Sequence, residues 1–135
     1  MANNLLFIDT SAFYSFFDKN DKNYENISKS LSSREEAFVT SNYIIDELIT
    51  LFRVRKFDVS QFEHFIEAIW EEKICSLIRV TPEIESEAWQ ILKKYNDANF
   101  SFTNCTSFVL MRKYSIKKAC SLDKHFSIAV FELIN

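Results

Sequence analysis

The sequence predicts an α/β fold in which helices cover both faces of a central parallel sheet of about four to five strands. Short apolar segments alternate with longer ones in which apolar residues recur three and four positions apart. The first short segment, residues 5–8, is apolar throughout, as is typical of a strand buried on both faces. No repeat or Pro-rich linker divides the 135 residues, so we expect one domain spanning residues 1–135.

The elements follow from these patterns in chain order. Strands are expected at residues 5–8, 37–40, 76–80 and 119–122. Helices are expected at residues 11–17, 24–31, 43–53, 61–72, 83–95 and 105–114, so two helices in succession precede the third strand. The single proline, Pro82, follows Thr81 as the first residue of a helix follows its N-cap.

The complete absence of glycine excludes several enzyme classes. Phosphate-binding loops, dinucleotide-binding loops and the serine hydrolase elbow all need glycine where backbone turns sharply or approaches a ligand. Positions with positive φ are then expected to use asparagine, the next best residue there. The candidates lie between periodic segments: Asn20, Asn23, Asn96 and Asn99.

Charge and cysteine content limit which partners the protein can have and in which cellular compartment it is expected. The net charge of -3 lacks the basic excess of a protein that coats nucleic acid, so any nucleic acid must be bound locally. Cys75, Cys105 and Cys120 form neither a disulfide framework nor a CxxC motif, and reduced thiols are expected. The N-terminus has no basic region before a short apolar run, which favours a cytoplasmic protein without a membrane span.

Acidic residues follow two of the expected strands. Asp9 follows the first strand and Asp123 the last, and the carboxyl ends of parallel strands share one edge of the sheet. Each alone would more often be a helix N-cap, but together they indicate a site. In the helix between them, Glu47 lies beside the apolar stripe that contains Leu48, whereas its neighbour Asp46 is expected to face solvent.

The start of the helix expected near residue 105 supplies a further element. Thr103 is expected as its N-cap and Asn104 as its first helical residue. The positive end of this helix would then suit an anion, either a carboxylate or a phosphate.

Four fragments together resemble the PIN-domain ribonucleases, and in size and in one stretch the VapC-type toxins of toxin-antitoxin pairs. They are residues 7–13 (FIDTSAF), 46–48 (DEL), 100–108 (FSFTNCTSF) and 122–126 (LDKHF). The resemblance implies that Asp9, Glu47, position 104 and Asp123 bind Mg²⁺ or Mn²⁺ and catalyse phosphodiester hydrolysis in RNA. It also implies a cognate antitoxin and a homodimer. Four clustered carboxylates repel one another, and a hard, oxygen-loving cation offsets that repulsion.

The chain departs from the family at position 104, where Asn104 stands in place of an aspartate. An amide oxygen can ligate a cation but adds no negative charge. We therefore expect weak or absent activity. Because Asp9, Glu47 and Asp123 are all present, a deliberate substitution is favoured over a natural non-catalytic paralogue.

Other side chains are expected to support the site, to be structural, or to contact partners. Thr10, Ser11 and Ser107 are expected to support the metal ligands, and His64 to be structural or exposed. A helix that carries Phe13 and Phe16 is apolar on most sides, which favours a partner or dimer surface beside ordinary core packing. Basic residues that could contact RNA, with a solvated face as the alternative, are Arg53, Arg55, Lys56, Arg112 and Lys124.

Two other functions remain open from the sequence. One is a PIN-fold binding module without catalysis. The more remote one is a phosphate-accepting receiver domain, which would need a paired acid after the first strand and an Asp after the third; the chain has Thr10 and Thr81 there.

Overall fold

The computed structural model describes residues 4–135 and contains a five-stranded parallel sheet in the order β3-β2-β1-β4-β5. The strands are β1 (Leu5–Ile8), β2 (Ala37–Ser41), β3 (Ser76–Ile78), β4 (Lys118–Cys120) and β5 (Glu132–Ile134). Phe7 of β1 pairs with Val39 on one side and Ala119 on the other. The strand predicted to be buried on both faces is therefore the central one.

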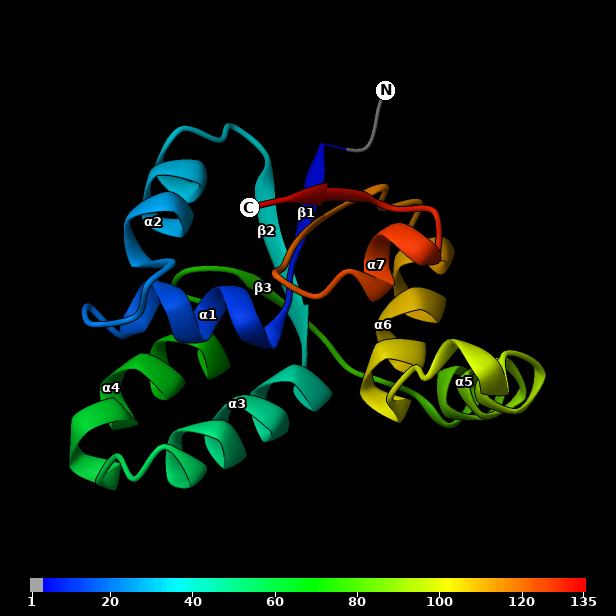
Figure 1. Cartoon of the computed structure of the whole chain (residues 1–135), viewed down its shortest axis with the longest axis horizontal. Coiled ribbons are helices and arrows are strands. Elements are labelled where there is room, and N and C mark those ends of the chain that lie inside the picture. The colour runs from blue at the N-terminus through cyan, green and yellow to red at the C-terminus, as the bar shows by residue number, and fades with distance from the viewer. Residues whose placement is uncertain (1–3) are drawn as a thin grey trace.

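Helices cover both faces of this sheet (Figure 1). They are α1 (Thr10–Phe17), α2 (Tyr24–Ser32), α3 (Asn42–Val54), α4 (Val59–Trp70), α5 (Pro82–Lys94), α6 (Phe102–Lys113) and α7 (His125–Ile128). Helices α1 to α4 lie to one side in Figure 1, and α5 to α7 lie to the other. The predicted three-layer α/β/α arrangement is confirmed.

The apolar core explains why β1 is central. Leu6, Phe7 and Ile8 are all buried, and Phe7 packs against Phe126 of α7 at 6.3 Å between ring centroids. On the α1 side, aromatic rings fill the space between α1, α3 and α4, with Phe52 stacked on Phe62 at 4.7 Å. Of the two phenylalanines considered for a partner surface, Phe13 is a core residue and Phe16 is 41% exposed.

Helix caps are where the sequence prediction was partly wrong. Thr81 caps α5 as expected, its hydroxyl accepting the Ile84 N–H, with Pro82 in the first turn. The N-cap of α6, however, is Ser101 rather than Thr103, and Asn104 is the third helical residue. The reason is a capping box: the Ser101 hydroxyl accepts the Asn104 N–H, and the Asn104 side chain accepts the Ser101 N–H.

Positive φ values also differ from expectation. Of the four asparagines proposed for such positions, Asn99 alone adopts one, at 60°. The other described residues with positive φ are Lys56, Glu72, Ser115 and Val130. Each of these four lies in the turn just after the end of a helix. At such a position the direction that the chain must take next sets the backbone conformation, whichever residue stands there.

Two further features complete the fold. The three cysteines are buried and free, and burial raises the pKa of Cys75 to about 11 and that of Cys120 to about 12, so both thiols stay protonated at neutral pH. Among residues 4–135, no helix combines the length and apolarity that a bilayer crossing requires.

Candidate active site

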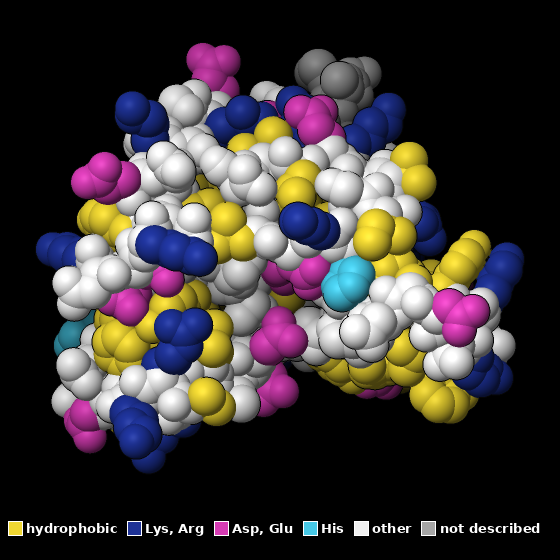
Figure 2. Space-filling view, viewed as in Figure 1, with side chains coloured by type: hydrophobic (Ala, Val, Ile, Leu, Met, Phe, Trp, Pro, Cys, Tyr) yellow, Lys and Arg dark blue, Asp and Glu magenta, His cyan; other side chains and the backbone are white. Residues whose placement is uncertain are grey.

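Acidic side chains from three elements meet at the carboxyl edge of the sheet. Asp9 directly follows β1, Asp123 follows β4, and Glu47 lies one turn into α3, which begins where β2 ends. The space-filling view shows acidic side chains gathered near the middle of the face, beside a histidine (Figure 2). The edge of the molecule below them is notched between the α3 side and the α5 side.

Asp9 is the buried centre of the site, with 5% of its surface exposed. Its Oδ2 accepts the Ser121 hydroxyl at 2.6 Å and lies 3.3 Å from the Ser11 hydroxyl, which also donates to it. Burial raises its pKa to about 6, against the lowering effect of the Ser121 hydrogen bond, and the charges of Glu47 and Asp123 raise it further. Both acids are therefore close enough to act electrostatically on Asp9.

Glu47 is positioned by helix α3 and by Thr10. The apolar residues Ile44 and Leu48 bury one side of α3 and leave Glu47 half-buried at the edge of that stripe. The Thr10 hydroxyl donates to Glu47 Oε1, which ties α3 to the start of α1. Asp46 faces solvent, as the sequence predicts.

Asn104 lies in the first turn of α6 and reaches Asp123. Its side chain is 6% exposed; its Oδ1 accepts the Ser101 N–H at 3.0 Å, and its Nδ2 donates to Asp123 Oδ2 at 3.2 Å. The capping box therefore aims the amide at the acid. The residue at position 104 interacts directly with the cluster.

Asp123 is oriented by its own chain as well. Its Oδ1 accepts the backbone N–H of His125 at 2.9 Å, and the ring Nδ1 of His125 lies 2.9 Å from the same oxygen without the alignment of a hydrogen bond. Its backbone N–H donates to the Ser121 hydroxyl at 2.9 Å. One third of the Asp123 side chain is exposed, so this acid faces the solvent side of the site.

Ser121 is the site residue that the sequence analysis missed. Its hydroxyl donates to Asp9 and accepts from the backbone of Asp123, so one buried group joins the ends of β1 and β4. A signal was present: Ser121 and Asp123 lie two residues apart just after β4, and a serine hydroxyl commonly bonds the backbone N–H two residues on.

Among the described basic side chains, His125 lies within ion-pair distance of a site acid, Asp123, and it is cationic only when protonated. Within the described residues, neither Lys nor Arg forms an ion pair with Asp9, Glu47 or Asp123. The carboxylates of Asp9, Glu47 and Asp123 offer oxygen ligands only, and such a donor set suits Mg²⁺ or Mn²⁺. In residues 4–135, however, no three His, Cys, Asp or Glu side chains are arranged to hold an ion as they stand.

The proposed supporting residues fall into two groups. Thr10 and Ser11 contact carboxylates of the site, and the Ser11 hydroxyl also accepts the Leu122 N–H at 2.9 Å. The buried hydroxyl of Ser107 has no hydrogen-bond partner and contacts none of the acids by hydrogen bonding. His64 is exposed on α4, away from this chemistry.

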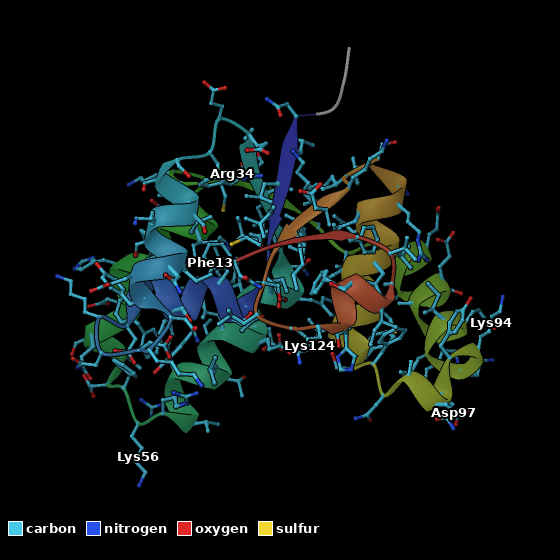
Figure 3. The ribbon with its side chains drawn as sticks, turned by 45° about the horizontal axis from the view of Figure 1, so that its top comes forward. Phe13, Arg34, Lys56, Lys94, Asp97 and Lys124 are labelled. Carbon is cyan, nitrogen blue, oxygen red and sulfur yellow. The ribbon has the colours of Figure 1, made fainter. Side chains whose placement is uncertain are left out.

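The proposed RNA-contacting residues do not form one patch. Lys124 is adjacent to Asp123 and lies near the middle of the view in Figure 3, whereas Lys56 lies at the far tip beyond α3. Arg53 and Arg55 share that end of α3, where the Arg55 guanidinium lies over the Tyr14 ring at 4.8 Å. Arg112, at the end of α6, donates to the Ala129 carbonyl at 3.3 Å.

The chain belongs to the PIN domain family, whose pattern matches residues 6–132. The match spans every strand-end acid described above.

Its relatives include VapC-type ribonucleases, which confirms the predicted resemblance. The chain is similar to the 23S rRNA-specific endonuclease VapC20 of Mycobacterium tuberculosis (strain ATCC 25618 / H37Rv), with 28% identity over 127 residues, 94% of this chain and 95% of that protein. Ribonuclease VapC26 of the same strain is 29% identical, with 90% of each chain covered. A VapC ribonuclease of Archaeoglobus fulgidus is 25% identical over 90% of this chain and 78% of that protein.

The crystal structure of Mycobacterium tuberculosis VapC20, described as a Sarcin-Ricin loop cleaving toxin, has the same fold. It superposes with a TM-score of 0.86 at 28% identity and covers 93% of this chain and 95% of that one. The receiver-domain alternative is therefore wrong, since the whole chain follows the PIN arrangement.

Proposed function

We propose that this chain, as a single domain spanning residues 1–135, is a metal-dependent endoribonuclease in which Asp9, Glu47 and Asp123 hold Mg²⁺ or Mn²⁺. Residues 1–3 lie outside the described part of the chain. The supporting observation is the buried, uncompensated carboxylate of Asp9 between two further acids. The ribonuclease names of the relatives give the reaction class.

Neighbouring side chains hold these acids in the orientations in which they could bind a cation. Thr10 fixes the rotamer of Glu47, and Ser121 holds Asp9 while it also holds the backbone of Asp123. When bound, the metal would supply an activated water and neutralise charge on the phosphodiester. Such a site needs no side-chain nucleophile.

Asn104 should weaken this activity. The amide contributes no charge to the site, and both of its ends are already occupied, by the Ser101 N–H and by Asp123. Metal affinity should fall with the lost carboxylate, and the activity of this chain should be low.

The Asn104→Asp variant tests the proposal. With Mg²⁺ or Mn²⁺ and a mixed RNA substrate, we expect cleavage to increase by about 10- to 100-fold, since changes around metal ligands typically have effects of that size. The measurement is the initial rate of fragment formation on a denaturing gel, with EDTA as the metal-free reference. The matched control is the double variant Asn104→Asp with Asp9→Asn, which should lose the gained activity.

A non-catalytic binding module is the second candidate, favoured by the contact of the Asn104 amide with Asp123. If the Asn104→Asp variant binds Mn²⁺ and RNA but cleaves no faster than the parent, the catalytic role of position 104 is wrong and the binding function is preferred.

We also propose the partners that the VapC resemblance implies: RNA as the substrate class, a cognate antitoxin, a second copy of this chain, and a cytoplasmic setting for all of them. An apolar hollow of about 310 Å³ between α1, α2 and the sheet supports a protein partner. Its lining includes Phe13, Phe16 and Phe38, and Phe16 is 41% exposed.

A further inference from the structure

We propose that the side-chain amide of Asn104 acts as a built-in substitute for a cation, which keeps the acid cluster assembled without metal and reduces its response to metal. This inference rests on the proposed metal site and deepens it. The observation that carries it is the contact of Asn104 Nδ2 with Asp123 Oδ2 at 3.2 Å.

The orientation of this amide is fixed by its partners. The Ser101 backbone N–H lies 3.0 Å from one end of the amide, and a backbone N–H only donates, so the oxygen Oδ1 must be at that end. The NH₂ group must therefore point to the other end, toward Asp123. A carboxylate only accepts, so both contacts are satisfied in this orientation alone.

An aspartate at position 104 would keep one contact and reverse the other. It would still accept the Ser101 N–H, because the capping box needs only an oxygen there. Its second oxygen would then stand where Nδ2 stands now, facing Asp123 Oδ2 across the present 3.2 Å. Two carboxylate oxygens at such a distance require a proton or a cation between them.

Burial decides which effect is larger. Position 104 is 6% exposed, so water screens the repulsion poorly, and Asp9 and Glu47 add negative charge nearby. An aspartate in the first turn of α6 would be stabilised by the helix dipole. That stabilisation is smaller than the repulsion between two like charges in close contact. The net effect of the aspartate without metal is repulsion.

The parent and the variant should then differ in their dependence on metal. In the parent, a hydrogen bond joins residues 104 and 123, so this part of the cluster should be stable with chelator present. In Asn104→Asp, the same place holds two charges that a divalent ion would offset.

Thermal unfolding of the full chain tests this, followed by circular dichroism in EDTA and in a series of Mn²⁺ concentrations, without RNA. We expect Asn104→Asp to unfold about 5 °C below the parent in EDTA, on the usual scale for a domain of this size. Saturating Mn²⁺ should raise the midpoint of the variant by several degrees more than that of the parent. If the variant fails to fold in EDTA, its refolding by Mn²⁺ is the same result in a stronger form.

Two further variants make the test specific. Asn96→Asp changes the net charge equally at an exposed position and should keep the parent's response to Mn²⁺. Asn104→Ala removes the amide without adding a charge, and it should lose stability in EDTA without gaining the enhanced Mn²⁺ response.

The proposal is overturned if Asn104→Asp is as stable as the parent in EDTA, or if both respond equally to Mn²⁺. Neither outcome depends on RNA cleavage. A chain that never cleaves RNA but shows the predicted difference would retain this inference and lose the nuclease assignment.

Discussion

Asp9 is buried, yet the proposed metal site needs its side chain to be ionised. Its pKa of about 6 lies above the ordinary value of 3.8, chiefly because burial disfavours the ionised form. Between pH 4 and 6 the folded chain therefore binds a proton that the unfolded chain has lost, so this residue makes the protein more stable as the pH falls. At neutral pH the ionised side chain costs up to about 3 kcal/mol of unfolding free energy when no metal is bound.

Replacing Asp9 by Asn should remove this cost. We expect Asp9→Asn to be more stable than the parent at pH 7.5 in EDTA, by up to about 3 kcal/mol, and the difference to vanish near pH 4. The Ser121 hydroxyl can still donate to an amide oxygen, so packing is preserved. Urea unfolding at several pH values measures the effect.

The exposed residue Asp97 provides the comparison for this test. Asp97→Asn changes the net charge equally and should not reproduce the gain in stability at pH 7.5. Parallel curves for the parent and Asp9→Asn would show that the burial of Asp9 carries no such cost.

Individual site residues were predicted unevenly. Asp9 and Asp123 were found because strand ends in a parallel sheet converge, a rule that needs no coordinates. Ser121 was missed because a serine on a short strand is ordinary, and its value lies in a contact with residue 9, far away in the chain. Such contacts depend on the register of β1 and β4, which the sequence pattern leaves open.

At the scale of elements, the first turn of α6 links helix capping to the site. Ser101 caps the helix, and the same hydrogen bonds orient the side chain at position 104. Thr81 caps the neighbouring helix α5 in a similar manner but contacts no acid of the site. The two caps therefore form a natural pair for comparison.

Ser101→Ala and Thr81→Ala should each destabilise the fold by about 1 kcal/mol, the typical value of an N-cap. In the Asn104→Asp background, Ser101→Ala alone should also reduce Mn²⁺ affinity, since the hydroxyl that accepts the backbone N–H of residue 104 is lost and the first turn of α6 loosens, although the residue 101 N–H can still donate to the carboxylate. Isothermal titration with Mn²⁺ would show this. Equal Mn²⁺ affinities in the two cap variants would contradict the coupling.

Elements with a long periodic pattern were predicted well, and so was the short apolar strand β1. The helices α3 and α5 were expected close to their observed ends, since apolar spacing and the Thr81-Pro82 cap define them. Strand β5 was missed because its three residues show no pattern, and its pairing with β4 alone defines it. The α6 cap was misplaced because Ser101 and Thr103 are equally good caps by residue type.

For the molecule as a whole, the charge distribution predicts how RNA would approach. The net charge of -3 repels a polyanion, so binding must come from a few basic residues near the acids. Of the proposed set, Lys124 is next to Asp123, and Lys56 extends from the far end of α3 (Figure 3).

Lys124→Ala should weaken RNA binding and reduce the slope of log affinity against log salt by about 1, the value for one phosphate contact. Lys56→Ala should change neither quantity. Fluorescence anisotropy with a labelled RNA at several salt concentrations, in Ca²⁺ to avoid cleavage, measures both. Equal effects of the two variants would argue for a diffuse rather than a local interaction.

The central position of β1 has a consequence for the stage of synthesis at which the candidate site can form. Asp9 is made early in synthesis, but the strand that brings Ser121 and Asp123 to it is made more than a hundred residues later. A chain released before β4 exists would leave one edge of β1 unpaired and lack two members of the cluster. The site therefore assembles only once β4 has been made.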